Sequence, residues 1–149
     1  MVDSRAKGAR AETQVRDRMR ELSALTWERV PSSGALDPKH GLKGDLYVPN
    51  EKNLYAVEVK HYAEDQFTTS IFTAKSPILF DWWSQTVRQA KQVSKKPLLL
   101  FKHDRSKIFV AYEEIPDGDY LYAYLNHEFP FYVALLDDWF AAESPKFIA

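Results

Sequence analysis

The chain has 149 residues, 45% of them hydrophobic and 14% aromatic, which suits one compact domain with a substantial core. It has no cysteine, and this excludes a disulfide framework, a thiolate zinc site and a cysteine nucleophile. The charged N-terminus and the lack of an apolar run near the roughly 20 residues of a membrane span predict a cytoplasmic protein with no membrane partner.

The net charge of -1 hides an uneven distribution along the chain. Residues 1–111 carry 19 basic and 13 acidic side chains, a balance of +6, whereas residues 112–149 carry one lysine against eight acids, a balance of -7. The basic part permits a surface that faces phosphate groups. We therefore predict a single domain over residues 1–149, with an acidic C-terminal extension at about 113–149.

The first half of the chain predicts a helix followed by three short strands. Apolar residues recur at helical spacing over residues 5–25, at Ala11, Val15, Met19 and Leu22. Short β-prone runs follow at 26–30, 45–48 and 54–60. The last two are expected to form a hairpin, because a Pro-Asn turn signal and a loop of about four residues separate them.

The second half predicts a further helix, two strands and a mixed acidic tail. Residues 61–76 lack a period and are expected to form a loop or flap, and residues 77–94 have a helical stripe. Strands are expected at 97–101, 107–112 and 129–134, and a short terminal helix at 135–142. The order predicts an α/β fold with a mixed central β-sheet flanked by helices.

The candidate catalytic residues are Asp45 and, after twelve intervening residues, the segment Glu58-Val59-Lys60. Alternate side chains of a strand share a face, so Glu58 and Lys60 extend an otherwise apolar face. Burying these charges is costly unless they pair or bind a metal. A surface hairpin with an ordinary Glu–Lys pair is the competing interpretation. In the expected hairpin, Asp45 lies close to Glu58.

This arrangement suits Mg²⁺, with Mn²⁺ as a substitute, because two carboxylates and the Val59 carbonyl oxygen are hard ligands. A metal on Asp45 and Glu58 would neutralise a phosphodiester and lower the pKa of a bound water. Lys60 would orient or deprotonate that water and stabilise the developing charge. Glu12, beside the apolar stripe of the first helix, is a candidate third carboxylate. A solvated helix glutamate is the alternative interpretation.

Four sequence blocks occur together: Lys7-Gly8-Ala-Arg10-Ala-Glu12, Arg29-Val-Pro-Ser-Ser33-Gly34, Gly44-Asp45 and Glu58-Val-Lys60. In this order they resemble the archaeal-type Holliday junction resolvases of the PD-(D/E)XK nuclease superfamily, and the chain looks like a phage or viral member. The resemblance covers roughly residues 5–105.

The resemblance implies a restriction-endonuclease-like core, Mg²⁺ dependence, a homodimer and branched double-stranded DNA with four-way junctions as substrate. It implies catalytic roles for Glu12, Asp45, Glu58 and Lys60, with Glu12, Asp45, Glu58 and Val59 at the metal. The DNA contacts that it implies are Lys7, Gly8, Arg10, Arg29 and Ser33. For a viral protein, the site of action is the host cytoplasm.

The sequence departs from the family pattern at two positions near the site. Gly44 stands where the superfamily name has Pro, and Thr13 stands where the family usually has Arg directly after the helix Glu. Residues 61–81 and the segment after Tyr112 do not align. Two alternatives to junction resolution stay open. One is another PD-(D/E)XK DNA nuclease, restriction-like, nicking or exonucleolytic, and the other is a non-catalytic DNA-binding protein with a nuclease core.

Overall fold

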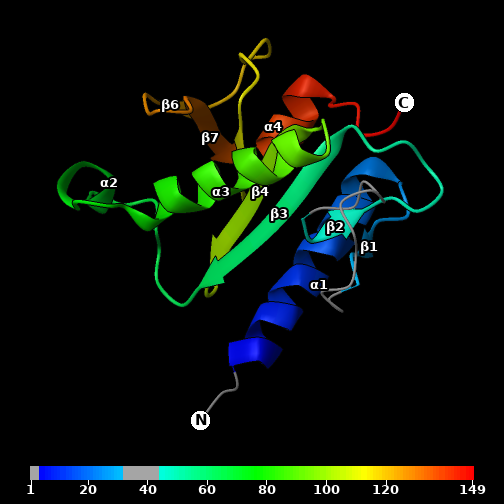
Figure 1. The fold of residues 1–149 in the computed structure, drawn as a ribbon, viewed down its shortest axis with the longest axis horizontal. Coiled ribbons are helices and arrows are strands. Elements are labelled where there is room, and N and C mark those ends of the chain that lie inside the picture. Colours follow the sequence, from blue (N-terminus) through cyan, green and yellow to red (C-terminus); the bar gives the residue numbers. More distant parts are fainter. Residues whose placement is uncertain (1–3, 32–43) are drawn as a thin grey trace.

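The computed structural model describes residues 4–31 and 44–149 (Figure 1). Its helices are α1 (Ser4–Ser23), α2 (Ser70–Thr73), α3 (Ile78–Gln92) and α4 (Leu136–Glu143). Its strands are β1 (Glu28–Arg29), β2 (Leu46–Tyr47), β3 (Tyr55–Tyr62), β4 (Lys96–His103), β5 (Phe109–Tyr112), β6 (Tyr122–Leu125) and β7 (Phe131–Leu135).

The described strands form one sheet in the order β1-β2-β3-β4-β5-β7-β6. β3 and β4 run parallel, joined through α3, and every other neighbouring pair is antiparallel. The predicted mixed sheet with flanking helices is therefore confirmed. The long parallel pair β3 and β4 lies at its centre, where its strands are buried on both faces.

Each face of the sheet carries its own hydrophobic core. One core joins α1 and α4 to the sheet through residues such as Val15, Val57 and Trp139. The other lies under α3 and includes Trp83 and Leu99. Figure 1 shows α3 and α1 as separate layers on either side of β3 and β4. The apolar stripe predicted for the first helix is thus confirmed as its core-facing side.

Most predicted elements are present, and the differences have physical causes. The β2–β3 connection covers residues 48–54 and is longer than predicted, because the Asn53 side chain closes it. The Asn53 Oδ1 accepts from the Val48 N–H at 2.8 Å, and its Nδ2 donates to the Val48 carbonyl at 2.9 Å. Residues 61–62 extend β3, and α2 is a single short helix within the expected loop.

Sequence periodicity missed β6. This strand lies at the edge of the sheet, and both Tyr122 and Tyr124 are about half exposed. Leu125 is buried in the core under α3, but the exposed positions also carry apolar aromatic rings, so the strand lacks the apolar–polar alternation from which a strand is recognised. Strands β6 and β7 and helix α4 join the same sheet and cores, so the acidic end of the chain packs onto the domain.

Candidate active site

The site lies where β2 begins, beside the part of β3 that has β4 on one side and no described strand on the other. The last ladder pair is Leu46 with Val57. Next to it, the Asp45 N–H donates to the Val57 carbonyl at 2.6 Å, and the Asp45 Oδ2 accepts the Val59 N–H at 2.7 Å. The Asp45 carboxylate thus takes the place of a strand partner for β3, which fixes its position on the sheet edge.

Gly44 makes this close approach possible. Its φ is +91°, and a Cβ at this position would lie 2.3 Å from the Val57 carbonyl oxygen. Proline is restricted to φ near -65° and cannot adopt this conformation. The departure from the superfamily's Pro therefore has a steric cause: at Gly44 the backbone must pass directly against β3.

Glu58 and Lys60 lie on β3 with their side chains on the same face, as the sequence predicted. Glu58 is only 8% exposed. Its Oε1 lies 3.6 Å from the Lys60 Nζ, which is too long for a strong hydrogen bond but close enough for electrostatic attraction. The Lys60 side chain is 28% exposed, so it extends from the buried carboxylate toward solvent.

The structure places the Asp45 and Glu58 carboxyl groups near each other, where each affects the pKa of the other. Burial raises the pKa of Asp45, and the Glu12 charge raises it further, against the Val59 N–H and the Lys60 charge. Burial also raises the pKa of Glu58, as does the Asp45 charge, whereas Lys60 lowers it. Two buried carboxylates with raised pKa values repel each other when ionised, and a bound cation relieves this repulsion.

Glu12 approaches the same site from α1 but has a cationic partner. Its Oε2 lies 2.9 Å from the Arg29 Nε on β1. Among residues 4–31 and 44–149, no three acidic or histidine side chains converge closely enough to hold a metal together. Glu12 is thus close enough to influence Asp45 electrostatically, while its carboxylate is held by Arg29.

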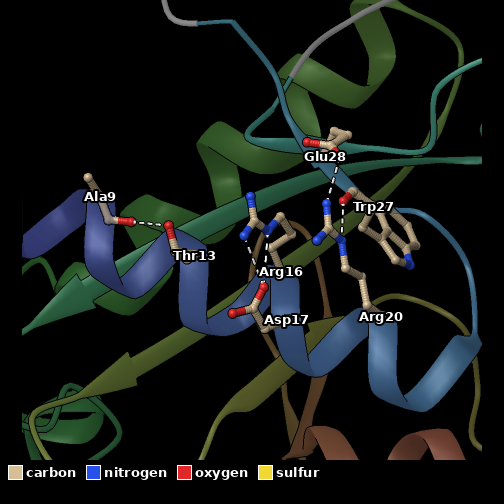
Figure 2. A network of polar contacts seen from close by, with 7 residues as sticks. All are labelled: Ala9, Thr13, Arg16, Asp17, Arg20, Trp27 and Glu28. Atoms are coloured by element: carbon tan, nitrogen blue, oxygen red, sulfur yellow. Dashed lines mark hydrogen bonds and ion pairs between the residues drawn. The ribbon is translucent and has the colours of Figure 1, made fainter.

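The placement of Glu12 depends on how α1 docks onto β1, and Figure 2 shows the contacts. Arg20 donates from Nε to the Trp27 carbonyl at 2.7 Å and from Nη2 to the Glu28 carboxylate at 2.6 Å. The Trp27 indole is buried beneath them. These bonds join the C-terminal part of α1 to β1 and so set the position of Glu12 relative to Arg29.

The residue set fits a hard divalent cation by its donor chemistry. Asp45 and Glu58 supply two carboxylates. The Val59 carbonyl points toward the same sheet edge as its N–H, because both groups of one strand residue point in one direction. Two carboxylates and a carbonyl leave room for waters and substrate oxygens, as Mg²⁺ requires.

The predicted DNA contacts are distributed over the two elements beside the site. Arg10 is exposed on α1 and Arg29 is exposed on β1. Lys7 and Gly8 fall within the backbone of α1, and Ser33 lies outside the described residues. Thr13 offers no cationic contact, and its hydroxyl donates to the Ala9 carbonyl at 2.9 Å within the helix (Figure 2).

Sequence reasoning missed a group of polar residues next to the site that includes His61 and Lys102. The two residues lie side by side in the β3–β4 ladder, although 40 positions separate them in the chain. Only the strand register places them together. The single sequence signal was the position of His61 directly after Lys60.

The tryptophans of α3 serve the core. Trp83 is fully buried and stacks on Phe131 with ring centroids 5.0 Å apart, and its indole N–H donates to the Phe129 carbonyl. Trp82 is 8% exposed and stacks on Tyr62.

No described helix is long and apolar enough to cross a membrane.

A family model described as "Phage putative PDDEXK endonuclease" matches residues 3–136 of the chain. The chain belongs to this family. The expected membership of the PD-(D/E)XK nucleases, and the phage character, are thereby confirmed. Nucleases of this type generally use divalent metal ions, and the acidic pair of this PDDEXK endonuclease agrees with that requirement.

Two known proteins are similar to this PDDEXK endonuclease. Protein D14 of Escherichia phage T5 is 46% identical over 113 residues, which cover 74% of this chain and 71% of D14. Among solved structures, Archaeoglobus fulgidus Hjc, a Holliday junction resolvase from an archaeal hyperthermophile, matches with a TM-score of 0.47. The match is 17% identical and covers 91% of this chain and 93% of Hjc.

Proposed function

We propose that this chain is a Mg²⁺-dependent DNA endonuclease with Asp45, Glu58 and Lys60 as its catalytic residues. The observation that carries the proposal is the buried pair of neighbouring carboxylates, Asp45 and Glu58, where β2 begins beside β3, with Lys60 next to them. A surface hairpin with a solvated Glu–Lys pair would have no reason to bury two acids against each other. Family membership supports the nuclease chemistry.

Asp45, Glu58 and the Val59 carbonyl would hold the metal, with Mn²⁺ as a substitute for Mg²⁺. When bound, the metal supplies charge neutralisation at the scissile phosphate and an acidified water. The hydrogen bond from Val59 to Asp45 orients that carboxylate before substrate arrives. Glu12 would contribute negative charge to the site and hold Arg29 in position through their ion pair.

Lys60 acts at the reacting phosphate through its ammonium group. Its Nζ lies beside Glu58, and its partial exposure lets it reach a bound substrate. There it would position the attacking water and donate hydrogen bonds to the developing negative charge. Arg10 is exposed on α1, the helix of Glu12, and Arg29 is exposed on β1. Together with Lys7, Gly8 and Ser33 they are the proposed contacts to the DNA backbone.

Within this activity, we propose four-way junctions in branched double-stranded DNA as the substrate, cut by a homodimer of the single domain over residues 1–149. The order of the four sequence blocks supports the junction assignment. Thr13 favours another DNA geometry as the second candidate, because its hydroxyl is used within α1 and supplies no phosphate contact in place of the family's arginine.

The test is cleavage of a labelled four-way junction and of linear duplex with the same sequences, with Mg²⁺, Mn²⁺ or chelator. We expect metal-dependent cutting that prefers the junction. Glu58→Gln and Asp45→Asn should lower the cleavage rate at least 100-fold while leaving DNA binding largely intact, because both variants keep the shape of the side chain.

Gln85 on α3 gives a matched control. It is a described, exposed polar residue outside the site, so Gln85→Ala should cut at the wild-type rate. Equal cutting of junction and duplex would contradict junction selectivity and favour the second candidate. If no DNA is cut with any divalent metal, the endonuclease proposal is wrong.

A further inference from the structure

A cavity of about 260 Å³ lies beside the end of β3, where His61 follows Lys60 in the chain. Three parts of the fold line it: α1, the end of β3, and the end of β4 with the turn that follows. The lining side chains are Arg10, Ala11, Gln14, His61, Lys102, Asp104 and Arg105. Its position depends on the register that pairs His61 with Lys102.

The side chains that line this cavity carry more positive than negative charge. Three arginine and lysine side chains, Arg10, Lys102 and Arg105, face one carboxylate, Asp104. Asp104 is engaged by His61, whose Nε2 lies 2.9 Å from its Oδ1. Within residues 4–31 and 44–149, the three cations form no ion pair. Lys102 donates only to the neutral Gln14 amide oxygen, at 3.2 Å. Cationic side chains that converge without carboxylate partners form a site for an anion.

Hydrogen bonds stabilise the backbone of the turn that carries Arg105. Arg105 has φ +63°, a conformation that costs energy in a residue other than glycine. The Ser106 side chain stabilises the turn: its Oγ accepts the His103 N–H at 3.0 Å and donates to the Lys107 carbonyl at 2.7 Å. Arg105 therefore extends from a hydrogen-bonded turn at the end of β4.

The cavity is lined by residues that adjoin the catalytic ones along the chain. Its residues Arg10 and Ala11 directly precede Glu12 on α1, and His61 directly follows Lys60 on β3. An anion bound there would belong to the same molecule whose phosphate meets Lys60. In a nucleic acid that anion is a neighbouring phosphate of the cleaved strand.

We propose that Lys102 and Arg105, together with Arg10, bind a non-scissile internal phosphate of the DNA strand that the active site cuts. This inference rests on the proposed DNA endonuclease function and adds a second phosphate site to it. The site fixes the position of the strand relative to Lys60, so these residues are positioning residues rather than catalytic ones. The contact should be independent of base sequence and sensitive to salt.

The test measures how DNA binding by the double variant Lys102→Gln, Arg105→Gln depends on salt, in chelator so that no cutting occurs. Each phosphate contact contributes roughly -0.9 to the slope of log affinity against log salt concentration. We therefore expect the slope of the double variant to be shallower by about that amount, and its binding at low salt to be weaker. The control Lys52→Gln, Arg88→Gln removes two exposed charges elsewhere and should keep the wild-type slope. The double variant Lys102→Gln, Arg105→Lys, which keeps a positive charge at position 105, should recover much of the lost affinity.

Two further readouts separate the possible results. The double variant should lose the same affinity for duplexes with and without a 5′-phosphate. A loss confined to the 5′-phosphorylated duplex would contradict binding of an internal phosphate. An unchanged salt slope in the double variant, with wild-type thermal stability, overturns the proposal even when the wild type cuts DNA. If the wild type binds DNA but cuts none, only the endonuclease proposal fails. A wild type that neither binds nor cuts DNA contradicts both.

Discussion

At the scale of single residues, the site contains groups whose charge or backbone conformation is unfavourable in the fold. Glu58 is a nearly buried carboxylate whose pKa is raised by burial and by the charge of a second carboxylate, Asp45. Gly44 adopts a backbone conformation that other residues rarely adopt, so that Asp45 can approach β3. Such costs are concentrated where function requires them, because a protein selected for stability alone would remove them.

The buried acid gives a prediction about stability without metal. Burial raises the pKa of Glu58 from 4.5 to about 8. Since the folded pKa lies above the unfolded one, the carboxyl group destabilises the fold increasingly as pH rises from about 4.5, and the penalty is complete above about pH 8. Glu58→Gln should therefore raise the Tm of the metal-free protein by several degrees near pH 8.5 and leave it almost unchanged near pH 4.

Thermal unfolding followed by circular dichroism measures this effect. Glu51→Gln is a suitable control, because Glu51 is exposed on the β2–β3 connection and should give the wild-type Tm at both pH values. Addition of Mg²⁺ should stabilise the wild type more than Glu58→Gln. A Glu58→Gln variant that is less stable than the wild type near pH 8.5 would contradict a strained acidic pair.

At the scale of elements, the docking of α1 onto β1 decides whether Glu12 reaches the site. Arg20 makes this connection through the Trp27 carbonyl and the Glu28 carboxylate (Figure 2). The indole N–H of Trp27 in turn donates to the Ser23 hydroxyl at 2.9 Å. One arginine thus links the end of the helix, the first strand and a buried aromatic ring.

Loss of this connection should weaken both the fold and the site. Arg20→Gln should lower the free energy of unfolding by about 1–2 kcal/mol, mainly through the lost hydrogen bond to the buried carbonyl, because the exposed ion pair contributes little. Arg16→Gln, on the same helix, breaks only a local contact with Asp17 and should change the free energy by less than about 0.5 kcal/mol. Urea unfolding measures both, and equal effects of the two variants would contradict the docking role.

At the scale of the whole molecule, the central strand β4 joins two cores into one cooperative unit. Its residues alternate between them: Leu98 and Leu100 belong to the core with α1 and α4, and Leu99 and Phe101 belong to the core under α3. The catalytic strand β3 is paired with β4 along its whole length. The geometry of the site therefore depends on packing on both sides of the sheet.

This arrangement predicts that damage to either core destabilises the entire domain. Leu99→Ala and Leu100→Ala should each cost about 2–5 kcal/mol, since both leucines are fully buried. Each variant should still unfold in a single transition that is the same by circular dichroism and by tryptophan fluorescence. Separate transitions in either variant would show that the two cores unfold independently.

The sequence by itself determined most of the elements and most of the acidic site. Periodicity placed α1 and α3, because a helix that packs on a sheet has a continuous apolar stripe. The spacing of Asp45, Glu58 and Lys60 predicted their proximity, because a hairpin joins strands that are close in sequence. Local patterns of this kind are encoded within a few residues and can be recognised without the fold.

The tertiary structure decided what depends on long-range register and packing. The pairing of His61 with Lys102 joins the ends of β3 and β4, and no local pattern encodes a parallel register across an intervening helix. The need for glycine at position 44 arises only because β3 passes within 2.3 Å of where its Cβ would lie. The burial that raises the pKa values of Asp45 and Glu58 likewise comes from the assembled domain, because the same residues in an isolated hairpin would remain in water.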